Sequence, residues 1–544
     1  MNTLNATLPP FQRAICKGHL VSTGINIRDL DRPLIGVVNS WNEIVPGHVH
    51  LREVAAWVKK GILAAGGYPL EFNTIAVCDG IAQGHAGMRY SLPSRELIAD
   101  SIELMVRAHG IFDGLVFIAS CDKIVPAMLM AAARLNLPSL LVPGGPMVPC
   151  ITPRESKAAR QAFLRGELDE DGLVAKTREY YPGPGACPFL GTANTMMMLA
   201  EALGFTLPDM ALTPAASAAA YDLARQSGEQ VVRLVARGLR PRDILTRPAF
   251  LNALTVLAAT GASLNSVLHL PAIAAEAGVD LTLTDFEMVS ERTPFLVAVT
   301  PNDAEHTVAD IHRAGGLPAL LNVLLPLLTG KVPTITGKSL AENVSGREVK
   351  NPAIIRSLDN PLAPSGGIAV LTGTLAPGGA VVKSSAVAAA DRVFSGPARV
   401  FNSQEEALAA AEAGRIQSGD VVVVRYEGPR GGPGMRELHR LTEVLAMVPH
   451  TAIVTDGRFS GATGGLAVGY VSPEAATGGP LALVAEGDLI RIDIPKRRLD
   501  LEVAPEELTR RRANFTPPSW KLSGCLAVYA AHVGEAAQGA IRRL

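Results

Sequence analysis

The stretch Gly114-Leu-Val-Phe-Ile-Ala-Ser120 and the three residues after it, Cys121, Asp122 and Lys123, decide the fold predicted for this chain. The first seven residues are mostly apolar, as in a strand that is buried on both faces of a parallel sheet. The run ends abruptly in a thiol, a carboxylate and an amine. Because ligands of open α/β sheets bind at the carboxyl ends of the strands, we expect a functional site here.

Strand and helix patterns alternate on both sides of this run, with glycines at the turns. Such alternation predicts an α/β fold in which a doubly wound parallel sheet is flanked by helices. The predicted elements are a strand over 34–39, a helix over 51–65, a strand over 72–77, a helix over 94–109, the strand 114–120, a helix over 126–135 and a strand over 139–142.

The sequence pattern changes near residues 350–366, where prolines and a pair of glycines indicate a linker. Before it, residues 151–182 predict an exposed excursion, residues 215–238 and 249–277 predict helices, and residues 296–300 predict a further strand. After it, short apolar pieces between glycine turns predict a barrel or a sandwich. These pieces are 368–372, 380–383, 398–401, 420–425, 451–454 and 489–494. We therefore expect an N-terminal α/β domain over 1–360 and a C-terminal β domain over 361–544 that ends in a helix.

Composition excludes several classes of protein. The chain has 544 residues, too many for one ordinary core, and its formal net charge of −1 offers no basic surface for nucleic acid or membranes. It lacks both a secretory signal pattern and an apolar run of about 18 residues, so we expect no membrane span. Six cysteines in a chain this long indicate metal or redox chemistry in a reducing cytoplasm rather than a disulfide scaffold.

Three cysteines follow strands or turns, next to aspartate or glycine. Cys78, Cys121 and Cys187 are 43 and 66 residues apart, so they match no local zinc or ferredoxin spacing. They are either small buried side chains or ligands that converge in the fold, and we favour ligands. The other three are interpreted as ordinary packing residues: Cys16, Cys150 and Cys525.

Asp79 and Asp122 stand directly beside two of these thiols. Carboxylate oxygens are the ligands of Mg²⁺, so the pattern would place a hard cation next to a soft one. The alternative is an ion pair with Lys123 that closes the strand end. The paired His48 and His50 are interpreted as polar or substrate-contacting side chains rather than metal ligands.

Three loops carry further polar residues. His85 and Arg89 either face a carboxylate substrate or lie in solvent. The glycine-rich segment Tyr426–Glu437 opens a helix and is typical of anion sites, although it lacks a P-loop or dinucleotide signature. In Thr455–Gly461, Ser460 is a candidate nucleophile or base, but no Gly-x-Ser-x-Gly elbow surrounds it, which argues against a hydrolase.

Taken together, these motifs resemble the family of dihydroxy-acid and sugar-acid dehydratases, which includes dihydroxy-acid dehydratase and 6-phosphogluconate dehydratase. The resemblance runs in family order over nearly the whole chain. The segments that carry it are Asn39-Ser-Trp-Asn-Glu43, Cys78-Asp-Gly-Ile-Ala-Gln-Gly-His-Ala-Gly-Met88, Ser91-Leu-Pro-Ser-Arg-Glu-Leu-Ile-Ala-Asp100, Ser120-Cys-Asp-Lys123, Gly185-Ala-Cys187, Thr192-Ala-Asn-Thr195, Glu427–Glu437 and Thr455-Asp-Gly-Arg-Phe-Ser-Gly461.

The resemblance implies a C-terminal β-barrel like the swivelling domain of aconitase and a homodimer or a dimer of dimers. It also implies an iron–sulfur cluster beside Mg²⁺. Many members carry a cluster cysteine as Pro-Cys-Asn-x-His, where this chain reads Pro46-Gly-His-Val-His50. Cys78 then supplies the third thiol, and we favour [4Fe–4S] over [2Fe–2S]. The residues carried over by motif are Cys78, Cys121 and Cys187 for the cluster, Asp79, Asp122 and Glu437 for Mg²⁺, Lys123 as a carbamate and Ser460 as the base.

The activity implied is loss of water from a 2,3-dihydroxy carboxylate to give a 2-keto acid. We place dihydroxy-acid dehydratase of branched-chain amino acid synthesis first and a sugar-acid (aldonate) dehydratase second. Pro188, Phe189 and Leu190 suggest an apolar wall that suits the first substrate class. A rival of another class is a non-catalytic metal-bound sensor on the same scaffold, but a sensor needs no base.

Overall fold

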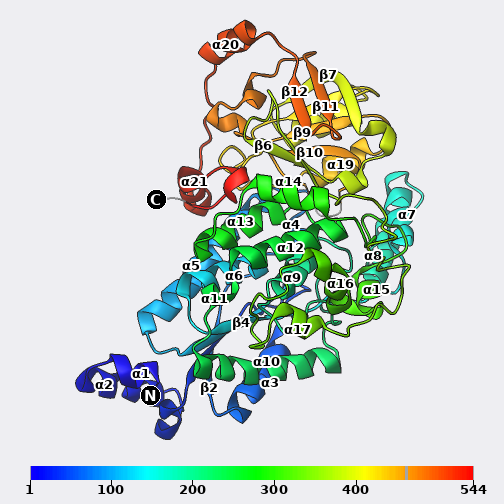
Figure 1. The fold of residues 1–544 in the computed structure, drawn as a ribbon. Coiled ribbons are helices and arrows are strands. Elements are labelled where there is room, and N and C mark those ends of the chain that lie inside the picture. Colours follow the sequence, from blue (N-terminus) through cyan, green and yellow to red (C-terminus); the bar gives the residue numbers. More distant parts are fainter. Residues whose placement is uncertain (1, 460–462, 543–544) are drawn as a thin grey trace.

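The computed structural model describes residues 2–459 and 463–542, which form two sheets in two lobes (Figure 1). The lower lobe contains a four-stranded parallel sheet in the order β2-β1-β3-β4. Every residue of β1, β3 and β4 is buried, as their apolar sequences require. The strands are β1 (Leu34–Asn39), β2 (Tyr68–Asn73), β3 (Gly114–Ala119) and β4 (Ser139–Pro143).

The α/β class and the parallel sheet are confirmed, but one strand lies a few residues earlier in the sequence than predicted. The predicted strand over 72–77 lies instead at Tyr68–Asn73, where it pairs with β1 from Leu34 opposite Tyr68 to Asn39 opposite Asn73. This strand is at the sheet edge and partly exposed, so its polar sequence carries a weaker strand pattern than the apolar residues after it.

Helices cover both faces of this sheet. The closest helix pair is α3 with α10, where Gly61 and Gly228 let the two backbones approach, since a Cβ at either position would overlap a carbonyl oxygen of the other helix. The helices of the lower lobe are α1 (Thr3–Thr7), α2 (Pro10–Val21), α3 (Leu51–Ala64), α4 (Asp79–Ala82), α5 (Ser91–His109), α6 (Ile124–Leu135), α7 (Pro153–Leu164), α8 (Glu170–Tyr180), α9 (Thr192–Ala202), α10 (Ala218–Arg237), α11 (Pro241–Ile244), α12 (Arg247–Thr260), α13 (Ser266–Ala277), α14 (Leu283–Arg292), α15 (Val308–Arg313), α16 (Gly316–Leu324) and α17 (Leu340–Val344).

Two predictions for this lobe are wrong in detail. The helix over 249–277 is two helices, because Gly261 adopts a left-handed φ of 51° that ends α12. The apolar run 296–300 forms no strand; Phe295 and Val297 make isolated bridges to Ala363 and Ile355. Prolines at positions 294 and 301 flank the run, and the amides of Leu296 and Val297 donate to the carbonyl oxygen of Ala259 in α12.

The upper lobe is an eight-stranded mixed sheet in the order β12-β11-β7-β8-β9-β10-β6-β5. A bridge between Thr372 and Arg498 joins its two edges, so the sheet is a nearly closed barrel rather than a sandwich. The sequence interpretation missed two of its strands, β10 and β12. Its elements are β5 (Ala369–Leu371), β6 (Gly379–Val382), β7 (Val393–Phe401), α18 (Gln404–Glu412), β8 (Val421–Val424), α19 (His439–Leu445), β9 (Ala452–Thr455), β10 (Leu466–Ser472), β11 (Leu489–Asp493), β12 (Arg498–Leu501), α20 (Pro505–Ala513) and α21 (Gly524–His532).

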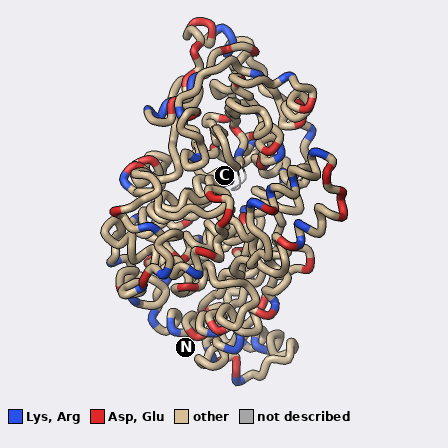
Figure 2. Tube along the Cα trace, turned by 90° about the vertical axis from the view of Figure 1, so that its right-hand side faces the viewer, with Lys and Arg blue, Asp and Glu red and all other residues tan. Residues whose placement is uncertain are grey.

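The two lobes meet along a buried surface. The fully buried Arg95 of α5 donates to the carbonyl oxygens of Gly539 and Ala540, so the end of the chain returns to the lower lobe. Lys, Arg, Asp and Glu are interspersed along the trace, without a long run of one sign (Figure 2). Among the described residues, no helix is both long and apolar enough to cross a membrane.

Candidate metal centre

The site begins where β3 ends. Cys121 adopts a left-handed backbone with φ of 65°, uncommon for a residue with a side chain, and the turn leads directly into α6. Lys123 is the residue before that helix and is only 1% exposed. The thiol, the carboxyl group and the ammonium group therefore lie at the carboxyl edge of the parallel sheet, as the sequence predicted.

Three carboxyl groups converge at this edge. One oxygen each of Asp79, Asp122 and Glu437 lies within 4.8 Å of the other two. Asp79 opens the short helix α4, a few residues after β2, whereas Glu437 comes from the barrel lobe. Oxygens on an octahedral Mg²⁺ stand about 3 Å apart when adjacent and about 4.2 Å apart when opposite, so the three carboxylates would draw together on binding that ion.

Two buried cations stand among these carboxylates. Lys123 Nζ lies 2.5 Å from Asp79 Oδ2 and 3.7 Å from both Asp122 Oδ2 and Glu437 Oε1. Arg458, with no exposed surface, pairs with Glu437 and lies 3.7 Å from Asp79 Oδ2. Three acidic groups thus face only two cationic side chains, and this deficit of positive charge suits a bound metal cation.

The acidic groups differ in protonation because their surroundings differ. Burial, followed by the charges of Asp79 and Glu437, raises the pKa of Asp122 to about 7 against the effect of Lys123. Burial opposes ionisation of Asp79 as well, but Lys123 and Arg458 outweigh it and lower the pKa of that carboxyl group. Without a metal, Asp122 therefore holds a proton more readily than Asp79 does.

Neutral side chains fix the orientation of the carboxylates. Ser91 Oγ donates to Asp79 Oδ1 over 2.7 Å, and Gln83 Nε2 donates to Glu437 Oε2 over 2.9 Å. Asn265 Nδ2 donates to Glu437 Oε1 over 3.0 Å, while the Tyr470 hydroxyl donates to Asn265 Oδ1 over 2.7 Å. Such supporting bonds hold ligands in place before a metal binds.

Sequence reasoning assigned none of these supporting residues. Gln83, Ser91 and Arg458 lie within the family motifs, close in sequence to candidate site residues. That closeness is the sequence signal by which they could have been found. Asn265 and Tyr470 stand in no motif, and only the packing of the two lobes brings them together.

The thiols of Cys78, Cys121 and Cys187 lie close enough for the charge on one to affect the ionisation of another. Burial and the charges of Cys78 and Cys187 raise the pKa of the Cys121 thiol well above its usual range. Burial, then Asp122 and Cys78, raise the pKa of Cys187. Ionised thiols at this place therefore need a bound cation, which fits the donor set of an iron–sulfur cluster.

The chain approaches Cys121 closely at Gly47. A Cβ on Gly47 would stand 2.6 Å from Cys121 Sγ and 3.3 Å from Ser120 Oγ. Gly47 therefore faces the thiol of Cys121. It lies in the segment where many members of the family that the motifs resemble carry a cysteine. Cys16, Cys150 and Cys525 carry free thiols, and Cys150 is exposed.

The histidines of the 45–50 segment are structural in their contacts. His48 is fully buried, with Nδ1 2.8 Å from the carbonyl oxygen of Ser40 and Nε2 3.0 Å from that of Ser120. Burial lowers its pKa to about 4. Nε2 of His50 lies 2.8 Å from the carbonyl oxygen of Gly144. Neither histidine belongs to the acidic group. Their interpretation as polar or substrate-contacting side chains stays a prediction.

The remaining candidates are more peripheral. The exposed His85 contacts its own loop, through the amide of Gly87 and the carbonyl oxygen of Ile81. After Cys187, Pro188 and Leu190 are buried and Phe189 is partly exposed. The candidate base Ser460 lies outside the described residues.

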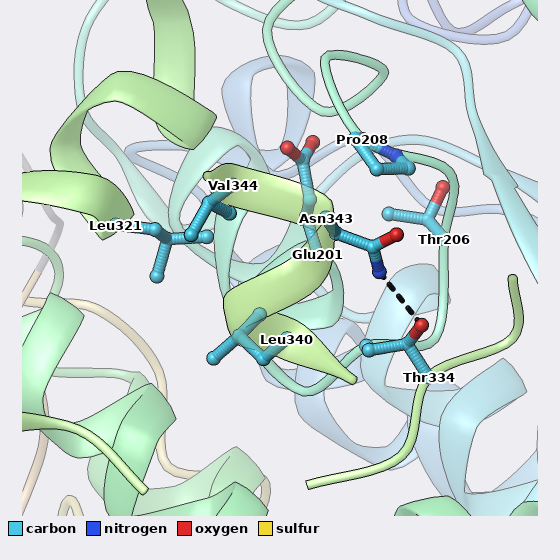
Figure 3. A pocket seen from close by; sticks show the side chains of 9 residues that line it. Glu201, Thr206, Pro208, Leu321, Thr334, Leu340, Asn343 and Val344 are labelled. Carbon is cyan, nitrogen blue, oxygen red and sulfur yellow. Dashed lines mark hydrogen bonds between the residues drawn. The ribbon is translucent and has the colours of Figure 1, made fainter. Parts of the chain in front are cut away.

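A small cavity between α9, α16 and α17 is separate from this site (Figure 3). Glu201, Thr206, Thr334 and Asn343 line it, and its volume of about 10 Å³ suits a single water molecule. Glu201 accepts hydrogen bonds from the amides of Asp209 and Ala211, and burial raises its pKa to about 8. The cavity is too small for an organic substrate.

Fold and site together define an α/β enzyme with a candidate metal centre between an α/β lobe and a barrel. Residues 32–343 match the family described as Dihydroxy-acid/6-phosphogluconate dehydratase N-terminal, and residues 353–540 match its C-terminal counterpart. Curated relatives named dihydroxy-acid dehydratase are similar over nearly the whole chain. Those of Nitratidesulfovibrio vulgaris (strain DP4) and Pyrococcus furiosus are each 50% identical, covering 98% of both chains, and that of Ignicoccus hospitalis is 52% identical, covering 91% of both.

The chain belongs to the dihydroxy-acid/6-phosphogluconate dehydratase family. It is an enzyme of the hydro-lyase class that acts on a small molecule, and the resemblance inferred from its motifs is confirmed.

Proposed function

We propose that this protein removes water from a 2,3-dihydroxy carboxylic acid to give a 2-keto acid, with a branched-chain dihydroxy acid as the first candidate substrate. The observation that carries the proposal is the convergence of three acidic oxygens beside three half-buried thiols where the two lobes meet. The names of the relatives support the same activity. A sugar acid is the second candidate, because the family also includes 6-phosphogluconate dehydratases.

Cys78, Cys121 and Cys187 would hold an iron–sulfur cluster, favoured as [4Fe–4S], and Asp79, Asp122 and Glu437 would hold Mg²⁺. When bound, these groups supply Lewis acidity for loss of the C3 hydroxyl group and offset the charge that develops at C2. The amine of Lys123 is the candidate for carbamylation, in which it adds to carbon dioxide with loss of a proton. The product is a further anionic oxygen ligand in place of a cation.

The side chains of this protein would position the substrate and move the proton. Ser460 would remove the C2 proton, a role that rests on its motif. A serine hydroxyl group ionises only close to strong positive charge, and the fully buried Arg458 stands two residues before it in the sequence. Glu437 and Asp79 are buried, and the lower effective dielectric constant there strengthens their interactions with charged groups.

Anaerobic assays test the substrate. We expect turnover of 2,3-dihydroxyisovalerate to exceed that of a panel of aldonates, because Pro188 and Leu190 are buried apolar residues next to Cys187. The opposite order would make the protein a sugar-acid dehydratase. Absence of turnover with every dihydroxy acid, in protein that contains iron and Mg²⁺, would contradict the proposed function.

Cysteine variants test the cluster. Cys121→Ser and Cys187→Ser should lose iron, the visible absorbance and activity together, whereas Cys150→Ser, which changes an exposed thiol, should retain all three. If the first two variants kept iron and activity, the cluster assignment would be wrong.

We also propose two domains, over 1–360 and 361–544, and a homodimer or dimer of dimers in the cytoplasm. Exposed apolar side chains on α2 and α5, such as Phe11 at 73% and Leu104 at 68%, are the surface that a second copy would cover. Light scattering after size exclusion measures the oligomer. Six free thiols suit a reducing compartment.

A further inference from the structure

Lys383 is a buried basic residue that takes no part in the proposed dehydration. It directly follows β6 and is 6% exposed. Among the residues that the structure describes, no hydrogen bond or ion pair reaches its Nζ atom. A buried ammonium group without a partner is destabilising, so the charged form of such a group calls for an anion from outside the described chain.

The strand directs this side chain toward the lower lobe. Val382 packs into the barrel core with Ala369 and Val468, whereas Val381 packs on the other face, in the cluster that includes Val370 and Tyr470. Side chains alternate along a strand, so Lys383 follows Val381 toward the lower lobe. This is also the face from which the Tyr470 hydroxyl reaches Asn265.

The turn after Lys383 contacts a loop that leads to the metal centre. The Ser385 hydroxyl donates to Asn302 Oδ1 over 3.2 Å, and Asn302 Nδ2 donates to the carbonyl oxygen of Gly261 over 3.1 Å. Four residues after Gly261, Asn265 donates to Glu437. Ser385, two residues after Lys383, therefore joins this turn to the loop that supports one of the candidate metal ligands.

The segment that precedes β10 lies on the other side of this turn. The amide of Gly465 donates to the carbonyl oxygen of Ala386 over 3.1 Å, and Phe459 packs over Gly469, the partner of Val381 in the sheet. Thr463 is 7% exposed, and no described residue bonds its hydroxyl group. Two polar groups without partners thus stand on adjacent segments at the meeting of the lobes.

We propose that Lys383 binds the carboxylate of the substrate, with its ammonium group donating to one carboxylate oxygen. This inference rests on the proposed function and deepens it, since it assigns a substrate-binding residue from the barrel lobe. One carboxylate oxygen can face the metal centre while the other accepts from the ammonium group. A substrate with a carboxylate then meets groups of both lobes, whereas an uncharged diol leaves Lys383 unpaired and is rejected.

The state of the free enzyme agrees with this role. Burial lowers the pKa of Lys383 to about 7, and no carboxylate of the described chain counteracts the shift. An anion bound beside the lysine favours the charged form and raises that pKa. Carboxylate affinity should therefore be highest below pH 7 and fall as the pH rises above it.

The test compares Lys383→Met with the wild-type holoenzyme, using Lys331→Met, a change at an exposed lysine, as the matched control. Calorimetry measures the affinity for 2-oxoisovalerate, an unreactive 2-keto carboxylate, and for its uncharged methyl ester. We expect Lys383→Met to bind the acid about 10- to 100-fold more weakly, as for loss of a charged hydrogen bond, and the ester without change. Lys383→Arg should retain binding and keep it above pH 8, where the wild type weakens.

Stability separates this role from a structural one. Replacing an unpaired buried charge with an apolar side chain of similar length should leave the midpoint of thermal unfolding equal or higher. Equal affinity of wild type and Lys383→Met for 2-oxoisovalerate would overturn the proposal, and so would a wild type that does not bind the acid. Because the ligand is not turned over, an enzyme inactive on all dihydroxy acids would refute the proposed function while the role of Lys383 stayed measurable.

Discussion

Gly47→Ala is the substitution for which the structure makes the sharpest prediction. The added Cβ would stand 2.6 Å from Cys121 Sγ, about 1 Å inside the normal contact distance. It would also stand 3.3 Å from Ser120 Oγ and 3.5 Å from the carbonyl oxygen of Gly185. No backbone strain opposes the alanine, because Gly47 does not adopt a left-handed φ. The effect is therefore steric and acts on a candidate cluster ligand.

The thiol cannot easily move away. Cys121 follows a fully buried strand and itself adopts a left-handed backbone, so a shift must involve its side-chain rotamer or the Gly47 loop. Overpacking of this kind costs about 1–3 kcal/mol of folding free energy. Displacement of the sulfur atom should also lower the iron content of protein purified without oxygen.

Urea denaturation of the metal-free protein measures the first effect, and iron analysis with the visible spectrum measures the second. Trp41 is a local fluorescent reporter, because its indole N–H donates to the carbonyl oxygen of Val49 in the same loop. Gly183→Ala is the control, since its Cβ would meet nothing within 4 Å. Should Gly47→Ala match that control in both stability and iron content, the close approach to Cys121 would be refuted.

Three further predictions follow from other parts of the molecule. Gly61→Ala should lower the free energy of unfolding by about 3 kcal/mol, because its Cβ would overlap a backbone carbonyl of α10. Gly18→Ala, on the open surface of α2, should be neutral or should stabilise the protein by up to about 1 kcal/mol. Urea titration of both variants measures the difference. Glu201 has a pKa raised to about 8, so its contribution to stability is present below its unfolded pKa and is lost as the pH rises through 8. Thermal unfolding of Glu201→Gln from pH 5 to 9 should consequently depend less on pH than that of the wild type, and an unchanged slope would contradict the assignment. Ser91→Ala removes the donor to Asp79 Oδ1 and should weaken Mg²⁺ binding about 10-fold in calorimetric titration, whereas an unchanged affinity would show that Ser91 does not orient this ligand.

Much of the architecture was predictable because it depends on local patterns. The apolar strand 114–120 and its neighbours carry their own hydrophobic signal, and the turn at Cys121 to Lys123 falls where parallel sheets place their ligands. The run 296–300 has the same apolar composition, but the amides of Leu296 and Val297 bond to α12, so composition alone could not distinguish the run from a strand.

The amino-acid sequence by itself determined the order of the two lobes, the family motifs and the carboxylates and thiols beside the sheet edge. The tertiary structure alone decided which distant side chains complete the site. Arg458 and Asn265 reach Glu437 from positions 21 and 172 residues away in the chain, and no periodicity or spacing encodes such contacts. Lys383 is the same case, since its burial without a partner in the described part of the chain exists only once the barrel packs against the α/β lobe. The physical reason is that a local pattern sets the conformation of a segment, whereas the desolvation and charge of a buried group depend on everything that packs around it.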